Sequence, residues 1–315
     1  AAAGKVPTTT KKLLEWESGI SKPTINQAKK LAKIYKRPFV LLFLREIPLD
    51  FQPLQDFRNK GSKPLSTASI FIIREIQQKQ AWISELNQEN NFEKLNFIGK
   101  YSISNNPKEV ANDIIKELNI NPLNYKTKNP NKVWIESAER KGIFISRSSY
   151  INSKMTLDSE EFQGFVIADS YAPFIFINTD DWGPSQLFTL IHELAHLWLA
   201  ESGISNITEV ENNTFNNHPV ELFCNEVAAN ILMPENSFKE NFNERNMKKT
   251  ANIYNVSSYA VIVRALNLNI ITYKQYQILK NNIQIEYNDF LKREVDKKEE
   301  LKKKGGKGGP DYFLL

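Results

Sequence analysis

The stretch TLIHELAHLWLA, residues 189–200, contains the pattern His-Glu-x-x-His and decides the fold. Residues four positions apart in a helix lie on one face, so His192 and His196 can present both imidazoles to one metal ion, with Glu193 beside them. A zinc hydrolase requires two such neutral nitrogen ligands and a carboxylate that accepts a proton. The pattern therefore favours a metal-binding helix over an ordinary helix that carries two histidines.

The distribution of histidine supports the metal-binding interpretation. A chance match to the pattern in a chain of this size has a probability of roughly 1 in 100. The 315 residues include three histidines, and all of them fall between residues 192 and 218. Side chains that bind metals are therefore concentrated around this one helix.

A catalytic zinc ion takes three protein ligands and leaves one position open, so a third ligand is required. The candidates downstream are His218, Glu209, Glu211, Glu221, Glu226 and Cys224. We select Glu221 because it lies on a predicted helix, residues 219–234, with Asn225 one turn later on the same face. Asn225 could then accept the second N–H of a ligand histidine and fix its ring.

The remaining polar residues near the motif have simpler interpretations. Glu226 lies about 100° further round the helix than Asn225 and does not share its face. We interpret Cys224 as a small apolar residue packed against the helix of the motif, and Glu201 as part of a solvated face. For His218 two roles stay open: a hydrogen bond to a developing oxyanion or substrate, or a helix cap.

The first part of the chain is predicted to be helical. Residues 1–48 carry two helical patterns separated by Gly19 and Pro23, and residues 49–68 indicate a linker rich in proline. A helical region follows at 69–128. It contains one long amphipathic helix over 69–95 and a second over 106–118, with Asn106 and Pro107 as its cap and first residue.

The core containing the motif is predicted to span residues 129–245. A short strand is expected at 143–146, and two strands at 162–168 and 173–178 should form a hairpin. The helix of the motif should begin near Pro184. A helical unit is expected over 246–295, followed by a charged, glycine-rich tail at 296–315.

Composition sets broad limits on partners and location. The net charge of +5 comes from 41 basic and 36 acidic residues spread along the chain, so nucleic acid is permitted as a partner and not demanded. The single cysteine fits a reducing compartment. We find no apolar segment long enough for a signal peptide or a membrane span, so we expect a cytoplasmic protein with no membrane partner.

Several motifs in order resemble the ImmA/IrrE family of zinc metallopeptidases. Gly164-Phe165 form the Gly-Phe strand motif, and Phe176-Ile177-Asn178 form the end of the second hairpin strand. Phe188-Thr189 with His192 to His196 form the extended HExxH motif, and Glu221 to Pro234 form the helix after it. Two positions depart from the family pattern, Val227 and Cys224, and both are packing positions. The agreement of ordered motifs is more specific than HExxH alone.

This resemblance implies one Zn²⁺ per chain, held by His192, His196 and Glu221, with Glu193 as the general base. It also implies an α+β fold that is mainly helical: a zincin-like metallopeptidase core with a small sheet packed on the HExxH helix, and helical N- and C-terminal units. The family's usual role is cleavage of a helix-turn-helix repressor, which releases genes in stress responses or mobile elements. We expect the hairpin to hold the substrate as an added strand.

The N-terminal residues resemble the second half of a helix-turn-helix module, followed by the tripeptide DFR at 56–58. The first helices of such a module have no counterpart here. An alternative function is therefore a regulator that binds DNA or protein, with a silent or structural zinc site; Lys302, Lys303, Lys304 and Lys307 could contact phosphates or simply keep the tail solvated. A regulated toxin or defence protease is a further alternative.

Overall fold

The computed structural model describes residues 6, 8–35, 39–44, 53–58, 63–125, 129–148, 157–158, 161–179, 183–205 and 218–303. The chain divides into two compact units. One contains residues 1–53 with 64–78, and the other contains residues 54–63 with 79–315. The second unit carries the sheet and the HExxH motif.

The first unit is helical. It contains α1 (Thr10–Glu17), α2 (Ile25–Ile34), the 3-10 helix η1 (Phe39–Phe43) and the first half of α3 (Thr67–Glu89). The side chain of Thr24 accepts from the backbone of Gln27, whose side chain accepts in return from the Thr24 N–H, so α2 begins with a capping box. The two predicted helical patterns are confirmed, and their assignment to a helix-turn-helix module stays a prediction.

A small mixed sheet forms the centre of the second unit. Its strands lie in the order β1-β5-β3-β4-β2. The central pairs β3–β4 and β3–β5 are antiparallel, whereas β1–β5 and β2–β4 are parallel. The strand bounds are β1 Gln55–Asp56, β2 Phe144–Arg147, β3 Gly164–Ile167, β4 Phe174–Ile177 and β5 Gly203–Ser205. The protein is therefore an α+β protein that is mainly helical.

The hairpin prediction is confirmed, with Phe165 opposite Phe176, but the role given to it is wrong. β3 pairs with β5 on its other side, and β4 pairs with β2, so neither strand has a free edge. A substrate strand cannot add to an edge that is already paired. Two strands were also missed: β5, and β1, which lies inside the segment interpreted as a linker.

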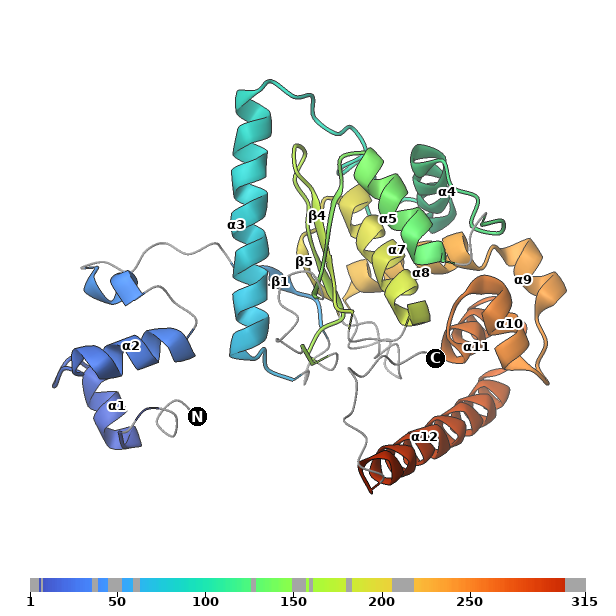
Figure 1. Ribbon diagram of the computed structural model, residues 1–315. Coiled ribbons are helices and arrows are strands. Elements are labelled where there is room, and N and C mark those ends of the chain that lie inside the picture. Colours follow the sequence, from blue (N-terminus) through green and yellow to red (C-terminus); the bar gives the residue numbers. More distant parts are fainter. Residues whose placement is uncertain are drawn as a thin grey trace. The chain divides into compact units, whose positions relative to one another are not determined.

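Helices pack on one face of the sheet. The HExxH helix α7 (Gly183–Leu199) lies against β3 and β4, and α8 (Pro219–Leu232) packs against α7. Figure 1 shows these two helices on the same side of the strands as α4 (Pro107–Leu118) and α5 (Pro130–Arg140). From Leu190 to Trp198 every residue of α7 is fully buried, and six of the nine residues are apolar.

Two helix ends in this unit show how local sequence sets the boundaries. α4 begins as predicted: Pro107 is its first residue, and the side chain of Asn106 accepts from the backbone N–H of Lys108. The long helix α3 ends at Glu89 and not at residue 95. Asn91 takes a left-handed backbone conformation with φ of 57°, which an α-helix does not tolerate.

Four helices complete the second unit: α9 (Glu235–Asn241), α10 (Met247–Tyr254), α11 (Ser258–Asn267) and α12 (Tyr273–Lys303). The buried guanidinium of Arg264 on α11 donates to the carbonyl of Met233 and to the side chain of Asn230, which ties α11 to the end of α8. The predicted tail begins too early, because α12 continues to Lys303; residues 304–315 lie outside the described residues. No helix within the described ranges is long and apolar enough to cross a membrane.

We expect Trp198→Ala to lower the free energy of unfolding by about 3–5 kcal/mol. The Trp198 ring is fully buried, stacks on Phe97 with centroids 4.5 Å apart, and donates from Nε1 to Asp113 at 2.9 Å. Urea unfolding followed by circular dichroism measures the change. Trp82→Ala is the control, because Trp82 is 63% exposed and should change stability by less than about 0.5 kcal/mol. Equal losses in the two variants would contradict this account of the core.

Candidate metal centre

The helix α7 brings two imidazoles together. The Nε2 atoms of His192 and His196 lie 3.0 Å apart, and both side chains are fully buried. Their spacing of one helical turn places both rings on the same face of α7, as the sequence predicts. The other faces of α7 also carry core residues, so the face with the two histidines stays buried.

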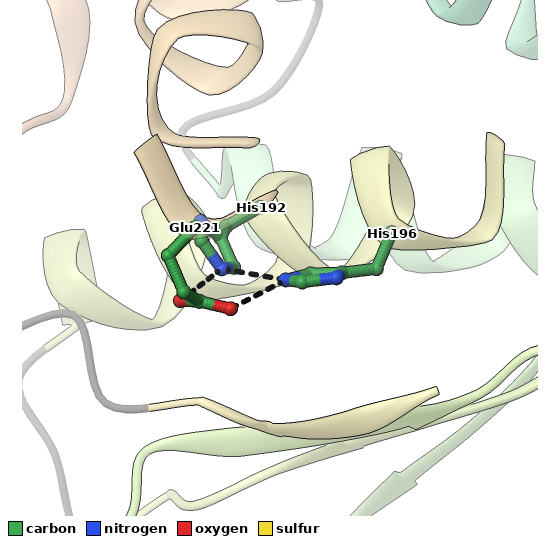
Figure 2. A group of neighbouring side chains, drawn as sticks. All are labelled: His192, His196 and Glu221. Atoms are coloured by element: carbon green, nitrogen blue, oxygen red, sulfur yellow. Dashed lines mark hydrogen bonds and ion pairs between the residues drawn. The ribbon is translucent and has the colours of Figure 1, made fainter. Parts of the chain in front are cut away.

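The helix α8 supplies a carboxylate to the same point. Glu221 Oε1 lies 3.0 Å from His196 Nε2, and Oε2 lies 3.2 Å from His192 Nε2 (Figure 2). The ligand atoms of these three residues all lie within 4.8 Å of one another, and all three residues are buried. The selection of Glu221 among the downstream candidates therefore agrees with the geometry.

This set fits a zinc ion. Two zinc–ligand bonds of about 2.0–2.1 Å at a tetrahedral angle separate the ligand atoms by roughly 3.3 Å, close to the separations found here. Two imidazoles and one carboxylate are also a ligand set of catalytic zinc, which keeps a fourth position open. The donor atoms therefore converge as a metal site requires.

Burial sets the charge states of the ligands. Burial lowers the pKa of His196 despite the neighbouring Glu221, so the imidazole stays neutral, which is the form that binds metal. Burial by itself would raise the pKa of Glu221, but its interactions with His192 and His196 outweigh that effect and hold this pKa below its usual range. The site thus offers a neutral imidazole at His196 and an anionic carboxylate at Glu221.

Glu193 lies beside the ligands and is fully buried. Among the described residues neither of its carboxylate oxygens has a hydrogen-bond partner. Burial raises its pKa well above the usual range, and the charge of Glu221 adds to this; the nearby Ser205 hydroxyl, which lies 3.5 Å from Glu221 Oε1, only partly offsets them. A carboxylate in this environment is a strong proton acceptor.

The neighbouring strand leaves space for this carboxylate. A Cβ atom at Gly164 on β3 would lie 2.9 Å from Glu193 Oε1 and 2.8 Å from Thr189 Cγ2. Separations this short are not tolerated between carbon and its neighbours, so any side chain at residue 164 would displace Glu193 or the strand. The glycine of the Gly-Phe motif is therefore needed for the packing of the general-base candidate.

The structure shows one of the two roles left open for His218. Its Nδ1 accepts from the backbone N–H of Val220 at 3.4 Å, so His218 is the N-cap of α8. Its side chain is exposed. A contact with an oxyanion or substrate stays a prediction.

The hydrogen bond expected from the ring N–H of a ligand histidine to Asn225 is not formed among the described residues. Asn225 is half-buried, and its Oδ1 has no partner among the residues that the structure describes. The same holds for the Nδ1 atoms of His192 and His196. The interpretation of Cys224 is confirmed, because the residue is fully buried in the core between α7 and α8.

The sequence analysis missed one residue of the site, Phe57. Its ring stacks on His196 with centroids 5.3 Å apart and planes inclined by 23°, and lies 5.0 Å from the ring of His218. Phe57 belongs to the tripeptide DFR, which was noted only for its resemblance. The contact arises because β1 pairs with β5, and local periodicity gives no signal for a pairing between such distant segments.

A buried set of two histidines and a glutamate, beside a second buried glutamate, defines a candidate hydrolytic metal centre. Residues 138–266 match the Peptidase_M78 family model, described as the IrrE N-terminal-like domain. This part of the chain is thus similar to the ImmA/IrrE metallopeptidases, and the matched range includes all four residues. It extends beyond residue 245, where the core was predicted to end, into α11. A search of the curated proteins found no match.

We expect the purified protein to carry about one divalent metal ion per chain, and Glu221→Ala to lose it. The variant removes the only carboxylate whose oxygens approach both imidazoles among the described residues. Plasma mass spectrometry measures the metal content. Glu226→Ala on the exposed face of α8 is the control and should retain the metal. Equal metal content in the two variants would exclude Glu221 as a ligand.

We also expect Glu193→Gln to stabilise the metal-free protein increasingly as pH rises. The raised pKa means that folded Glu193 keeps a proton which the unfolded chain releases above about pH 4.3. The contribution of Glu193 to the free energy of unfolding is therefore complete below about pH 4.3 and is lost as pH rises toward the pKa of Glu193 in the folded state. Tm measured from about pH 5 to about pH 8 should diverge between wild type and variant. Parallel Tm curves for wild type and Glu193→Gln would contradict the unfavourable burial of Glu193.

Proposed function

We propose that this protein is a zinc-dependent endopeptidase that cleaves one particular protein, with helix-turn-helix repressors as the substrate class. The observation that carries the proposal is the convergence of three ligand atoms beside a buried carboxylate that has no hydrogen-bond partner among the described residues. The family match supports the peptidase activity. The restriction to a repressor, and the derepression of genes that would follow, rest on the resemblance to ImmA/IrrE proteins alone.

His192, His196 and Glu221 hold the zinc ion. When bound, the ion polarises the scissile carbonyl and lowers the pKa of water. Glu193 accepts the proton of the attacking water, because its carboxylate is buried beside the ligands and has no hydrogen-bond partner in the part of the chain that the structure describes. It then donates this proton to the nitrogen of the leaving amine, so one residue acts first as base and then as acid.

The rigidity of the site supports this division of roles. α7 and α8 pack against each other along the core, so the ligands cannot separate without disturbing buried apolar contacts. Gly164 allows Glu193 to remain close to the ligands. Catalytic groups held in place before substrate binds need little rearrangement during the reaction.

We expect Glu193→Gln to lower the rate of cleavage about 100- to 10,000-fold while the metal content stays near that of the wild type. Glutamine fills the same volume but cannot accept the proton. The assay incubates each protein with helix-turn-helix repressors and identifies new N-termini by mass spectrometry. Casein serves as the generic substrate and should remain intact. Rapid casein digestion would contradict the narrow specificity, and cleavage retained by the variant would exclude Glu193 as the base.

The same variant separates this proposal from a DNA-binding regulator. Binding to duplex DNA would weaken steeply with salt, because it depends on release of counterions from phosphates. Salt-sensitive binding by the whole chain, unchanged in Glu193→Gln and unaccompanied by any cleavage, would favour the regulator.

A further inference from the structure

We propose that the segment 54–58 is a structural part of the metal centre and that Phe57 is a positioning residue for the ligand His196. We name this segment the strap. The proposal rests on the proposed function, because it assigns a role to Phe57 in the same site. It adds to the family match, since the strap lies outside residues 138–266.

The stacked contact between Phe57 and His196 is the first observation. Phe57 is 4% exposed, and its ring lies nearly parallel to the imidazole of His196. A flat ring against the face of an imidazole restricts rotation of that imidazole about its Cβ–Cγ bond. It also keeps water away from one face of the ligand.

The absence of another restraint on His196 gives the contact its importance. A metal-bound histidine almost always donates its second ring N–H to a carboxylate, a carbonyl or water, and this bond fixes the ring. Within the described part of the chain, the buried Nδ1 of His196 has no such partner. We therefore assign to Phe57 the orienting role that a hydrogen bond has in other sites.

The sheet contains a position shaped for the Phe57 ring. A Cβ atom at Gly203 on β5 would lie 2.1 and 2.2 Å from two carbons of that ring, and 2.9 Å from the carbonyl oxygen of Gln55. Gln55 is the direct partner of Gly203 in the parallel β1–β5 pair. Only glycine at residue 203 lets the strap lie this close to the sheet.

Polar contacts fasten the strap on both sides of Phe57. The backbone N–H of Phe57 donates to the carbonyl of Ile204 at 3.1 Å. Arg58, whose side chain is 7% exposed, donates to both carboxylate oxygens of Asp56 and to the carbonyl of Glu161 at 2.8 Å. Two neighbouring residues of the strap are thus held by the strand β5 and by the segment before β3.

A second ion pair continues this attachment. Lys63 pairs with Asp158, and the carbonyl of Lys63 accepts a hydrogen bond from Arg58 of the strap. The buried guanidinium of Arg58 thus donates to four acceptor oxygens, and these bonds fix the strap against its neighbours. The strap is therefore built to hold Phe57 over the ligand.

The test compares Phe57→Ala with Phe174→Ala in the full chain. Phe174 is the matched control: it is 5% exposed, stacks on Phe144, and lies on β4, which is separated from β1 by two strands. Zinc affinity is measured by competition with a chelator, and the absorption spectrum of the Co²⁺-substituted protein reports the ligand geometry. We expect Phe57→Ala to weaken zinc binding about tenfold or more and to change the Co²⁺ spectrum, with neither effect in Phe174→Ala.

Gly203→Ala tests the same contact from the sheet. This substitution leaves the Phe57 side chain intact but fills the space that its ring occupies beside residue 203. It should therefore reproduce the loss of zinc affinity and the change in the Co²⁺ spectrum. Circular dichroism shows whether each variant is folded. Zinc affinity and Co²⁺ spectrum that stay at wild-type values in folded Phe57→Ala would overturn the proposal. Faster cleavage by Phe57→Ala with unchanged zinc affinity would also overturn the proposal, because the strap would then only obstruct access of the substrate to the site.

The experiment separates this proposal from the proposed function. A wild-type protein that binds no zinc would contradict the proposed function, and the role of Phe57 would fail with it. A wild-type protein that binds zinc and cleaves its substrate, beside a Phe57→Ala variant with unchanged affinity, would overturn only the role of Phe57.

Discussion

The contact of Glu221 with the two imidazoles is the interaction on which the rest of the second unit depends. Burying a carboxylate costs several kcal/mol unless its oxygens find partners. Here both oxygens face His192 and His196, and those rings come from another helix. The packing of α7 on α8 is therefore constrained at one point by polar geometry, whereas the surrounding apolar contacts tolerate more variation in shape.

Two glycines show how the sheet adapts to this constraint. Gly164 leaves space for the carboxylate of Glu193, and Gly203 leaves space for the ring of Phe57. Each lies on a strand next to a site residue and has backbone angles that any residue could adopt, since neither has a positive φ. Their role is to allow close approach and not to permit an unusual backbone. A fold-level description would classify both as ordinary strand residues.

Local sequence was sufficient for the features that depend on local physics. The one-turn spacing of His192 and His196, the cap at Asn106 and the hairpin of β3 and β4 could all be predicted, because each depends on neighbours a few residues away. Local sequence could not predict the strands β1 and β5, the position of Phe57 or the end of α3 at Glu89. The first three depend on a pairing between distant segments, and the last on one left-handed asparagine. The use of the hairpin as a substrate-binding edge failed for the same reason, since the pairing of β5 was not foreseen.

The single thiol of the chain lies within this arrangement. Cys224 is fully buried on α8, one turn from Glu221, and burial raises the pKa of its thiol well above the usual range. A thiol reagent therefore reaches it only when the packing around α8 opens, and opening between α7 and α8 would also pull the ligands apart. The rate of alkylation at residue 224 thus reports the opening of the metal centre itself, without any engineered probe.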